Sequence, residues 1–214
     1  MTELPLDLIV LVADLDQEQT IRVLLGDRQR SLGIRPIRVE YLRHWRHDAG
    51  CFNEAPAILQ SYQERASYAL VLLDKDGSGK EHLSAEEIEG DLRDRLSATG
   101  WNDRAAAVVI EPELEIWIWS DSPEVEACLG WTGRHPALRD WLLVRELLRP
   151  DEPKPADPKH AFRCALREVG QRPSASVFAR IAARVGIDRC RDPSFARLRT
   201  RLSAWFRVAE QNSV

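Results

Sequence analysis

Short apolar runs alternate with helical patterns through the first 120 residues, and this alternation limits the possible folds more than any other feature. The runs cover residues 7–13, 37–42, 68–73 and 105–110. Each is long enough for a buried strand and too short for a helix. The segments between them predict helices near 17–31, 54–66 and 84–96. Such alternation predicts an α/β fold with a mostly parallel sheet and helices on both faces.

The strand pattern ends after residue 121. Ser122, Asp157 and Asp192 each precede a proline, which is typical of a capped helix start. Three helices are expected near 158–168, 174–185 and 193–207. The segment 149–158 holds four prolines in ten residues and predicts a stiff connector. We therefore expect an α/β domain at 1–121 and a helical extension at 122–214.

The charge of the chain is divided unevenly. Residues 1–133 hold 13 Lys/Arg and 25 Asp/Glu, a balance of −12, whereas residues 134–214 hold 17 and 9, a balance of +8. An acidic body with a basic tail suits a metal-dependent enzyme that acts on a polyanion, and equally two halves that attract each other. In the tail, Arg191, Arg197 and Arg201 are candidates for DNA or RNA contacts, or for a helix that faces solvent or a partner.

Several features argue for a cytoplasmic protein. The N-terminus has no basic segment before an apolar run, and no stretch approaches the roughly 20 apolar residues that span a bilayer. The four cysteines are scattered singly, without the spacing of a zinc site, and no chemistry is assigned to them. The sequence leaves the oligomeric state open.

Acidic residues follow three of the four predicted strands. In an open α/β sheet, ligands bind outside the carboxyl ends of the strands. Gathered carboxylates repel unless a cation neutralises them, and oxygen ligands of this kind favour Mg²⁺ or Mn²⁺. Such a site could polarise a phosphodiester and activate water. The acids are Asp14, Asp16 and Glu18 after the first strand, Asp74 and Asp76 after the third, and Glu111, Glu113, Glu115 and Asp121 after the fourth.

Three other interpretations of the loop that begins at Asp74 are weaker. An EF-hand calcium loop would need a glutamate where Ala85 stands, and a helix rather than a strand before it. The segment 73–78 also resembles the nucleophile motif of haloacid dehalogenase-type phosphatases, but that motif usually opens a chain. A phosphate loop would need a glycine at Asp74.

Aromatic and histidine side chains supply further candidates. His44 and His47 flank Trp45 after the second strand, which is typical either of a phosphate-facing edge or of a surface loop. The chain has seven tryptophans. Core packing is one use for them, and stacking on bases or on a partner is the other.

A strand-borne acid followed by Asp-x-Asp after a later strand resembles the Toprim domain of topoisomerases, primases and overcoming-lysogenization-defect nucleases. The segment 111–121, with its proline, acids and tryptophans, is similar to small Toprim-like bacterial proteins. The whole chain resembles a family grouped with the methylation-associated defence systems of bacteria. The stretches that carry this resemblance are 10–14, 48–52, 113–121 and 153–155.

The resemblance implies a component of an anti-phage system that acts with other defence proteins, and a nuclease or phosphohydrolase site that uses Mg²⁺ or Mn²⁺. It places Asp14, Glu18, Asp74, Asp76 and Glu115 as metal ligands, the last four also as catalytic residues. Toprim nucleases carry Glu-Gly directly after the first strand, whereas this chain has Ala13-Asp14. A non-catalytic subunit that binds nucleic acid or partner defence proteins is therefore the second hypothesis.

Overall fold

A four-stranded parallel sheet forms the centre of the molecule. The computed structural model describes residues 5–208. The strands lie in the order β2-β1-β3-β4, and every neighbouring pair is parallel. Strands β1, β3 and β4 are buried almost throughout, which explains their continuous apolar sequences, whereas the edge strand β2 is only partly buried. The bounds are β1 Leu6–Val12, β2 Val39–Arg43, β3 Ala66–Asp74 and β4 Ala105–Ile110.

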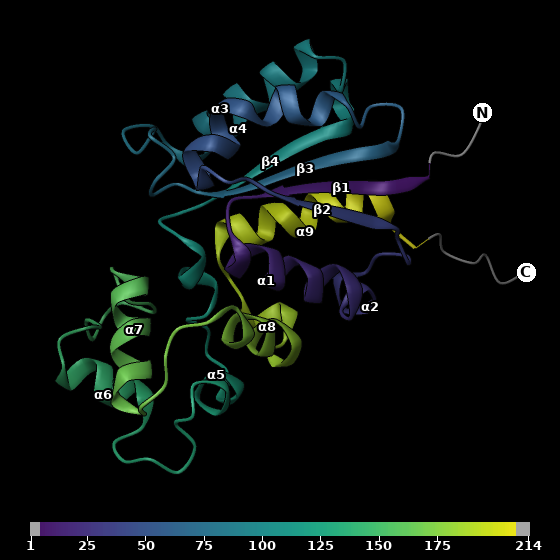
Figure 1. The fold of residues 1–214 in the computed structure, drawn as a ribbon. Coiled ribbons are helices and arrows are strands. Elements are labelled where there is room, and N and C mark those ends of the chain that lie inside the picture. Colours follow the sequence, from purple (N-terminus) through teal and green to yellow (C-terminus); the bar gives the residue numbers. More distant parts are fainter. Residues whose placement is uncertain (1–4, 209–214) are drawn as a thin grey trace, which may run out of the picture.

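Helices cover both faces of this sheet, as the sequence predicts (Figure 1). One face carries α3 (His47–Gln60) and α4 (Ala85–Ala98), and the other carries α1 (Leu15–Gly26) and α9 (Pro193–Phe206). Alternate side chains of each strand enter the two apolar cores, as expected from the period of two along a strand. The layout is consistent with a Rossmann-like or Toprim-like arrangement.

The chain changes direction at the centre of the sheet. From β1 it passes through α1 to β2 at one edge, then crosses by α3 to β3 on the other side of β1, and continues to β4. The helices that follow β1 and β3, which are α1 and α4, therefore lie on opposite faces of the sheet. This switch point is where open α/β sheets form a crevice at the carboxyl ends of their strands.

The part of the chain after residue 121 shares a core with the sheet. Helix α9 contributes Leu198, Leu202 and Phe206 to the same apolar cluster as β1 and α1. Arg28, in the turn after α1, donates hydrogen bonds to carbonyl oxygens at the end of α8, and α8 packs against α1. The bounds of the other helices of this part are α5 Pro123–Cys128, α6 Leu138–Val144, α7 Pro158–Glu168 and α8 Ala175–Arg184. Helices α6 and α7 lie beyond the carboxyl ends of the strands, whereas α8 packs on the side of α1 that faces away from the sheet (Figure 1).

Local capping signals are confirmed, but the boundaries of two predicted helices were wrong. Ser84 and Glu87 form a reciprocal capping box at the start of α4. The carboxylate of Asp157 likewise caps α7 by accepting the N–H of His160. The helix predicted at 54–66 instead begins at His47 and ends at Gln60. The helix predicted at 17–31 is instead divided into α1, which ends at Gly26, and the short helix α2 (Gln29–Leu32). Helix α6 and the short elements η1 (Asn102–Arg104), η2 (Leu114–Trp117) and η3 (Ile187–Arg189) were not predicted. Within residues 5–208, no helix combines the length and apolar character that crossing a membrane requires.

Candidate functional site

Three aspartates and a glutamine meet at the switch point. Asp14 follows β1 and caps α1, Asp74 ends β3, and Asp48 lies in the first turn of α3. Asp48 Oδ1 accepts the backbone N–H of Asp74 at 2.7 Å. The Gln17 side chain donates to Asp74 Oδ1 at 2.9 Å and to Asp48 Oδ1 at 3.4 Å. Gln17 is fully buried, and its side-chain oxygen Oε1 accepts the backbone N–H of Ala13, so the side-chain amide is fixed between the acids.

Asp48 and Asp74 ionise less easily than exposed aspartates do. Burial raises the pKa of Asp74 well above its ordinary value, and the charges of Asp48, Asp14 and Glu115 raise it further, against a backbone hydrogen bond from Leu114. Burial also raises the pKa of Asp48. The cluster therefore favours an arrangement in which a proton or a cation offsets part of its negative charge.

A fourth acid and a lysine extend this cluster toward α7. Glu115 lies in the 3-10 turn η2 and is buried. Burial raises its pKa; Lys159 opposes that shift and Glu113 adds to it, so that the pKa reaches about 7. Lys159, in the first turn of α7, pairs with Glu113. Burial lowers the pKa of Lys159, but the hydrogen bond to Glu113 and the charges of Glu115, Glu113 and Asp74 outweigh this and raise it. The ammonium group therefore stays charged beside the acids.

A polar cleft of about 440 Å³ opens beside Lys159. Its walls come from the loops that follow β3 and β4 and from the first turns of α7. Lys159 thus lines the cleft. Its charge lowers the pKa of Glu115, and the charges of Glu115 and Asp74 raise the pKa of Lys159. The cleft carries charges of both signs on a surface that solvent reaches. Its lining residues are Asp76, Pro112, Glu113, Ala156, Asp157, Pro158, Lys159, His160 and Arg163.

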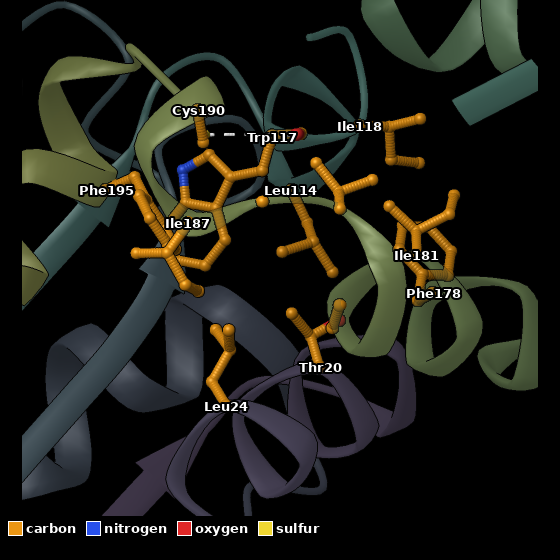
Figure 2. A pocket seen from close by; sticks show the side chains of 13 residues that line it. Thr20, Leu24, Leu114, Trp117, Ile118, Phe178, Ile181, Ile187, Cys190 and Phe195 are labelled. Carbon is orange, nitrogen blue, oxygen red and sulfur yellow. Dashed lines mark hydrogen bonds between the residues drawn. The ribbon is translucent and has the colours of Figure 1, made fainter. Parts of the chain in front are cut away.

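The other side of η2 packs on an apolar pocket (Figure 2). This pocket, about 50 Å³, is lined by side chains of α1, η2, α8 and the start of α9, among them Leu24, Trp117 and Phe178. Trp117 also donates from Nε1 to Ser194 Oγ at 2.7 Å. These contacts attach η2 to α9 and hold the turn that carries Glu115 in place.

The expected metal ligands are only partly brought together. Asp14, Asp74 and Glu115 interact electrostatically at the crevice. Glu18 lies one turn along α1 and pairs with Arg22 at 2.9 Å and Arg43 at 3.7 Å. Asp76 is exposed and lines the polar cleft. The donors have the chemistry that Mg²⁺ prefers. Among residues 5–208, however, no three Asp, Glu, His or Cys side chains are placed as a metal-ligand set.

Sequence reasoning missed three members of the cluster. Asp48 was hidden because the helix that carries it was expected to begin at residue 54 rather than His47. Gln17 has no sequence signal, since an isolated amide in a helix is usually exposed. For Lys159, the Asp157-Pro158 cap predicts a place in the first helical turn, but nothing local indicates that this turn lies beside Glu115.

The three arginines of the tail that were expected to contact nucleic acid lie in different surroundings. Arg197 pairs with Glu86 at 3.2 Å and Glu89 at 2.9 Å, and it donates to the carbonyl of Val109, so it attaches α9 to α4 and β4. Arg201 lies over the ring of Trp205, with 5.8 Å from its guanidinium carbon to the ring centroid. Arg191 is exposed in the segment before α9.

His44, next to Trp45, is buried. The interpretation of this histidine as part of a surface loop was therefore wrong. The ring of His44 contacts Glu54 Oε2 at 3.1 Å and accepts the backbone N–H of Arg46 at 3.0 Å. Most of the tryptophans pack in the core, for example Trp101 and Trp131. Trp45 is the exception, with 80% of its surface exposed.

Comparison with known proteins adds no relative. No family model matches the chain, and no curated protein or solved structure matches it either.

Proposed function

We propose that the protein is a phosphoester hydrolase, a nuclease or nucleotide phosphohydrolase, that acts as a component of a bacterial anti-phage defence system. The observation that carries the proposed activity is the placement of Lys159. Its ammonium group pairs with Glu113 in the wall of a polar cleft, and its charge acts on a buried glutamate, Glu115, whose pKa of about 7 suits proton transfer at neutral pH. The proposed defence role comes from the resemblance in segments 10–14, 48–52, 113–121 and 153–155.

The cleft has the size and charge expected for a phosphate-bearing ligand. Its volume of about 440 Å³ falls within the range of small-molecule sites, roughly 300–1,000 Å³. Lys159 and Arg163 supply cationic groups, and an ammonium or guanidinium donor is the usual partner of phosphate oxygens. In this proposal Lys159 binds the phosphate and stabilises the charge that develops on it.

Glu115 has the properties of a general base. Above pH 7 it is largely ionised and can take a proton from a water molecule next to the phosphate. The positive charge of Lys159 lowers the pKa of Glu115, so this pKa is less raised than burial alone would make it. The rate should therefore rise with pH through about 7 if Glu115 acts in this way.

Mg²⁺ or Mn²⁺ is a separate part of the proposal. The oxygen atoms of Asp14, Asp48 and Asp74 are chemically suitable, and a bound cation would relieve their mutual repulsion. Among residues 5–208, however, these side chains are not placed as a metal-ligand set. The roles of Glu115 and Lys159 are therefore argued without an ion.

The test is a hydrolysis assay with single-stranded DNA, RNA and an activated phosphodiester, with EDTA or with added Mn²⁺. Glu115→Gln should lower the rate by at least about tenfold and remove the pH dependence near 7, since positioned bases contribute about 10²–10⁴-fold. Lys159→Met should also lower the rate. The matched control is Glu64→Gln, which changes an exposed glutamate. Unchanged hydrolysis in Glu115→Gln would refute the proposed role of this residue.

A non-catalytic subunit is the second candidate, favoured by Ala13. This alanine is fully buried at the position where Toprim nucleases carry glutamate. If the wild-type protein cleaves none of these substrates with Mn²⁺ but forms complexes with nucleic acid or with other proteins of its defence system, this second function is supported.

A further inference from the structure

Trp45 is exposed in a chain that buries most of its tryptophans. Four-fifths of its surface is accessible, whereas the rings of Trp101, Trp117, Trp119 and Trp131 are almost completely buried. Arg46 lies over this ring, with 5.7 Å from its guanidinium carbon to the ring centroid, and most of the surface of Trp45 is still open to solvent. An aromatic ring so exposed can stack on a ligand.

The backbone around Trp45 is held in place from several sides. The N–H of His44 bonds to the carbonyl of Val12 at 2.9 Å, which joins this segment to the end of β1. The buried His44 ring contacts Glu54 and accepts the N–H of Arg46. A Cβ atom on Gly50 would overlap the His44 ring, so only glycine allows this packing. The ring of Trp45 is stacked at 19° to that of His44. A ligand that bound Trp45 would thus meet a largely ordered surface, which lowers the entropic cost of binding.

The position of Trp45 relates it to the acid cluster. It is three residues before Asp48, whose carboxylate accepts the N–H of Asp74. Three residues span at most about 10 Å of extended chain. Trp45 and the cluster therefore share the carboxyl edge of the sheet.

The surroundings of Trp45 suit a nucleobase better than a protein. Arg43 and Arg46 next to it are exposed, and each forms one ion pair, with Glu18 and Glu54 respectively. Protein interfaces usually have a contiguous apolar centre. Among residues 5–208, however, the other exposed large apolar side chains are Leu15, Val144 and Val208, of which only Leu15 follows the carboxyl edge of the sheet. A base needs only one aromatic face for stacking.

We propose that Trp45 is a stacking platform for an unpaired base of a single-stranded nucleic acid that is bound across the acid crevice. The inference rests on the proposed function and narrows its substrate to single-stranded DNA or RNA. An unpaired base presents its face to the ring, whereas the bases of a duplex are already stacked on one another. Because Arg43 and Arg46 are already paired with acids, the ring itself supplies most of the binding at this point.

The experiment measures the affinity of labelled single-stranded and duplex oligonucleotides by fluorescence anisotropy. Trp45→Ala should bind single strands about five- to a hundredfold more weakly, and Trp45→Phe should retain most of the affinity. Val144→Ser, which changes an exposed apolar side chain on α6, is the matched control and should bind as the wild type does. The fold loss in Trp45→Ala should be the same at low and high salt, since stacking releases no counterions.

An abasic scan tests the contact directly. Removing one base at a time from the oligonucleotide should weaken wild-type binding most at one position, and the same removal should have no effect on Trp45→Ala. The proposal is overturned if Trp45→Ala binds single strands like the wild type, if duplexes lose affinity equally, or if the scan is identical in both proteins. Binding of a protein partner that depends on Trp45, with unchanged oligonucleotide affinity, would also overturn it.

Failure here can be told from failure of the proposed function. If hydrolysis depends on Glu115 while Trp45→Ala binds and cleaves normally, only the stacking platform is refuted. If Glu115→Gln keeps full activity, the proposed function fails whatever the result for Trp45.

Discussion

The raised pKa of Glu115 makes a quantitative prediction about stability. Its carboxyl group moves from 4.5 to about 7 in the folded protein. The folded state therefore binds this proton more tightly than the unfolded state, so stability falls as pH rises from about 4.5 to 7. At about 1.4 kcal/mol for each pH unit, the loss is about 3 kcal/mol once the group is ionised in both states.

The substitution Glu115→Gln removes this titration. We expect the variant to be more stable than the wild type at pH 8, and its advantage to shrink by about 2–3 kcal/mol between pH 8 and pH 5. For a chain of this size that corresponds to a difference of roughly 4–12 °C in Tm. Urea unfolding at several pH values measures it directly, with Glu64→Gln as the control.

The result that would refute the reasoning is a difference between wild type and Glu115→Gln that does not change between pH 5 and pH 8. This would mean that the carboxyl group titrates alike in the folded and unfolded chain, and Glu115 would then not be the proposed base. The pKa can also be read from the carboxyl carbon resonance of a ¹³C-labelled glutamate, which should titrate near 7 in the folded protein.

Three further predictions follow from single contacts. Gly50→Ala should destabilise the protein by about 1–3 kcal/mol in denaturant unfolding, because the new methyl group overlaps the His44 ring, whereas Gly90→Ala, with room for a methyl group, should stabilise it by up to about 1 kcal/mol. Asp74→Asn should raise Tm at pH 8 more than at pH 5, because it removes a buried carboxyl group whose pKa is raised by burial and neighbouring acids; an equal effect at both pH values would contradict this. Cys51 should not react with a thiol reagent at pH 8 until denaturant is added, because burial raises its pKa and nearby aspartates raise it further; rapid native-state labelling at this position, identified by mass spectrometry, would contradict that.

Much of the fold was predictable because its signals are local. The buried strand β4 was predicted with the bounds that it has, since a continuous apolar run of six residues leaves few alternatives. The start of α4 was predicted from Ser84 and Glu87, which satisfy each other's backbone N–H groups. The start of α3 was missed, because Arg46 provides no side-chain cap and Gly50 is a poor helix former.

The candidate site was less predictable, because acids that follow strands need not turn the same way. Asp14 caps α1 and lies at the crevice, whereas Glu18, one helical turn later, pairs with Arg22 and Arg43 instead. Asp74 is buried, and Asp76, two residues on, is exposed in the polar cleft. The sequence thus indicated the edge of the sheet at which Asp14 and Asp74 lie, but not which other carboxylates meet them there.

The sequence by itself determined the α/β class, the buried strands and the capped starts of α4, α5, α7 and α9, since these depend on residues within a few positions of one another. Only the tertiary structure decided that α9 completes a face of the sheet, that Asp48 binds Asp74 across 26 residues, and that Lys159 reaches Glu113 across 46. The physical reason is that such contacts depend on the order of the strands and on the side on which each connection crosses. Both are set by the joint packing of two apolar cores rather than by any local pattern.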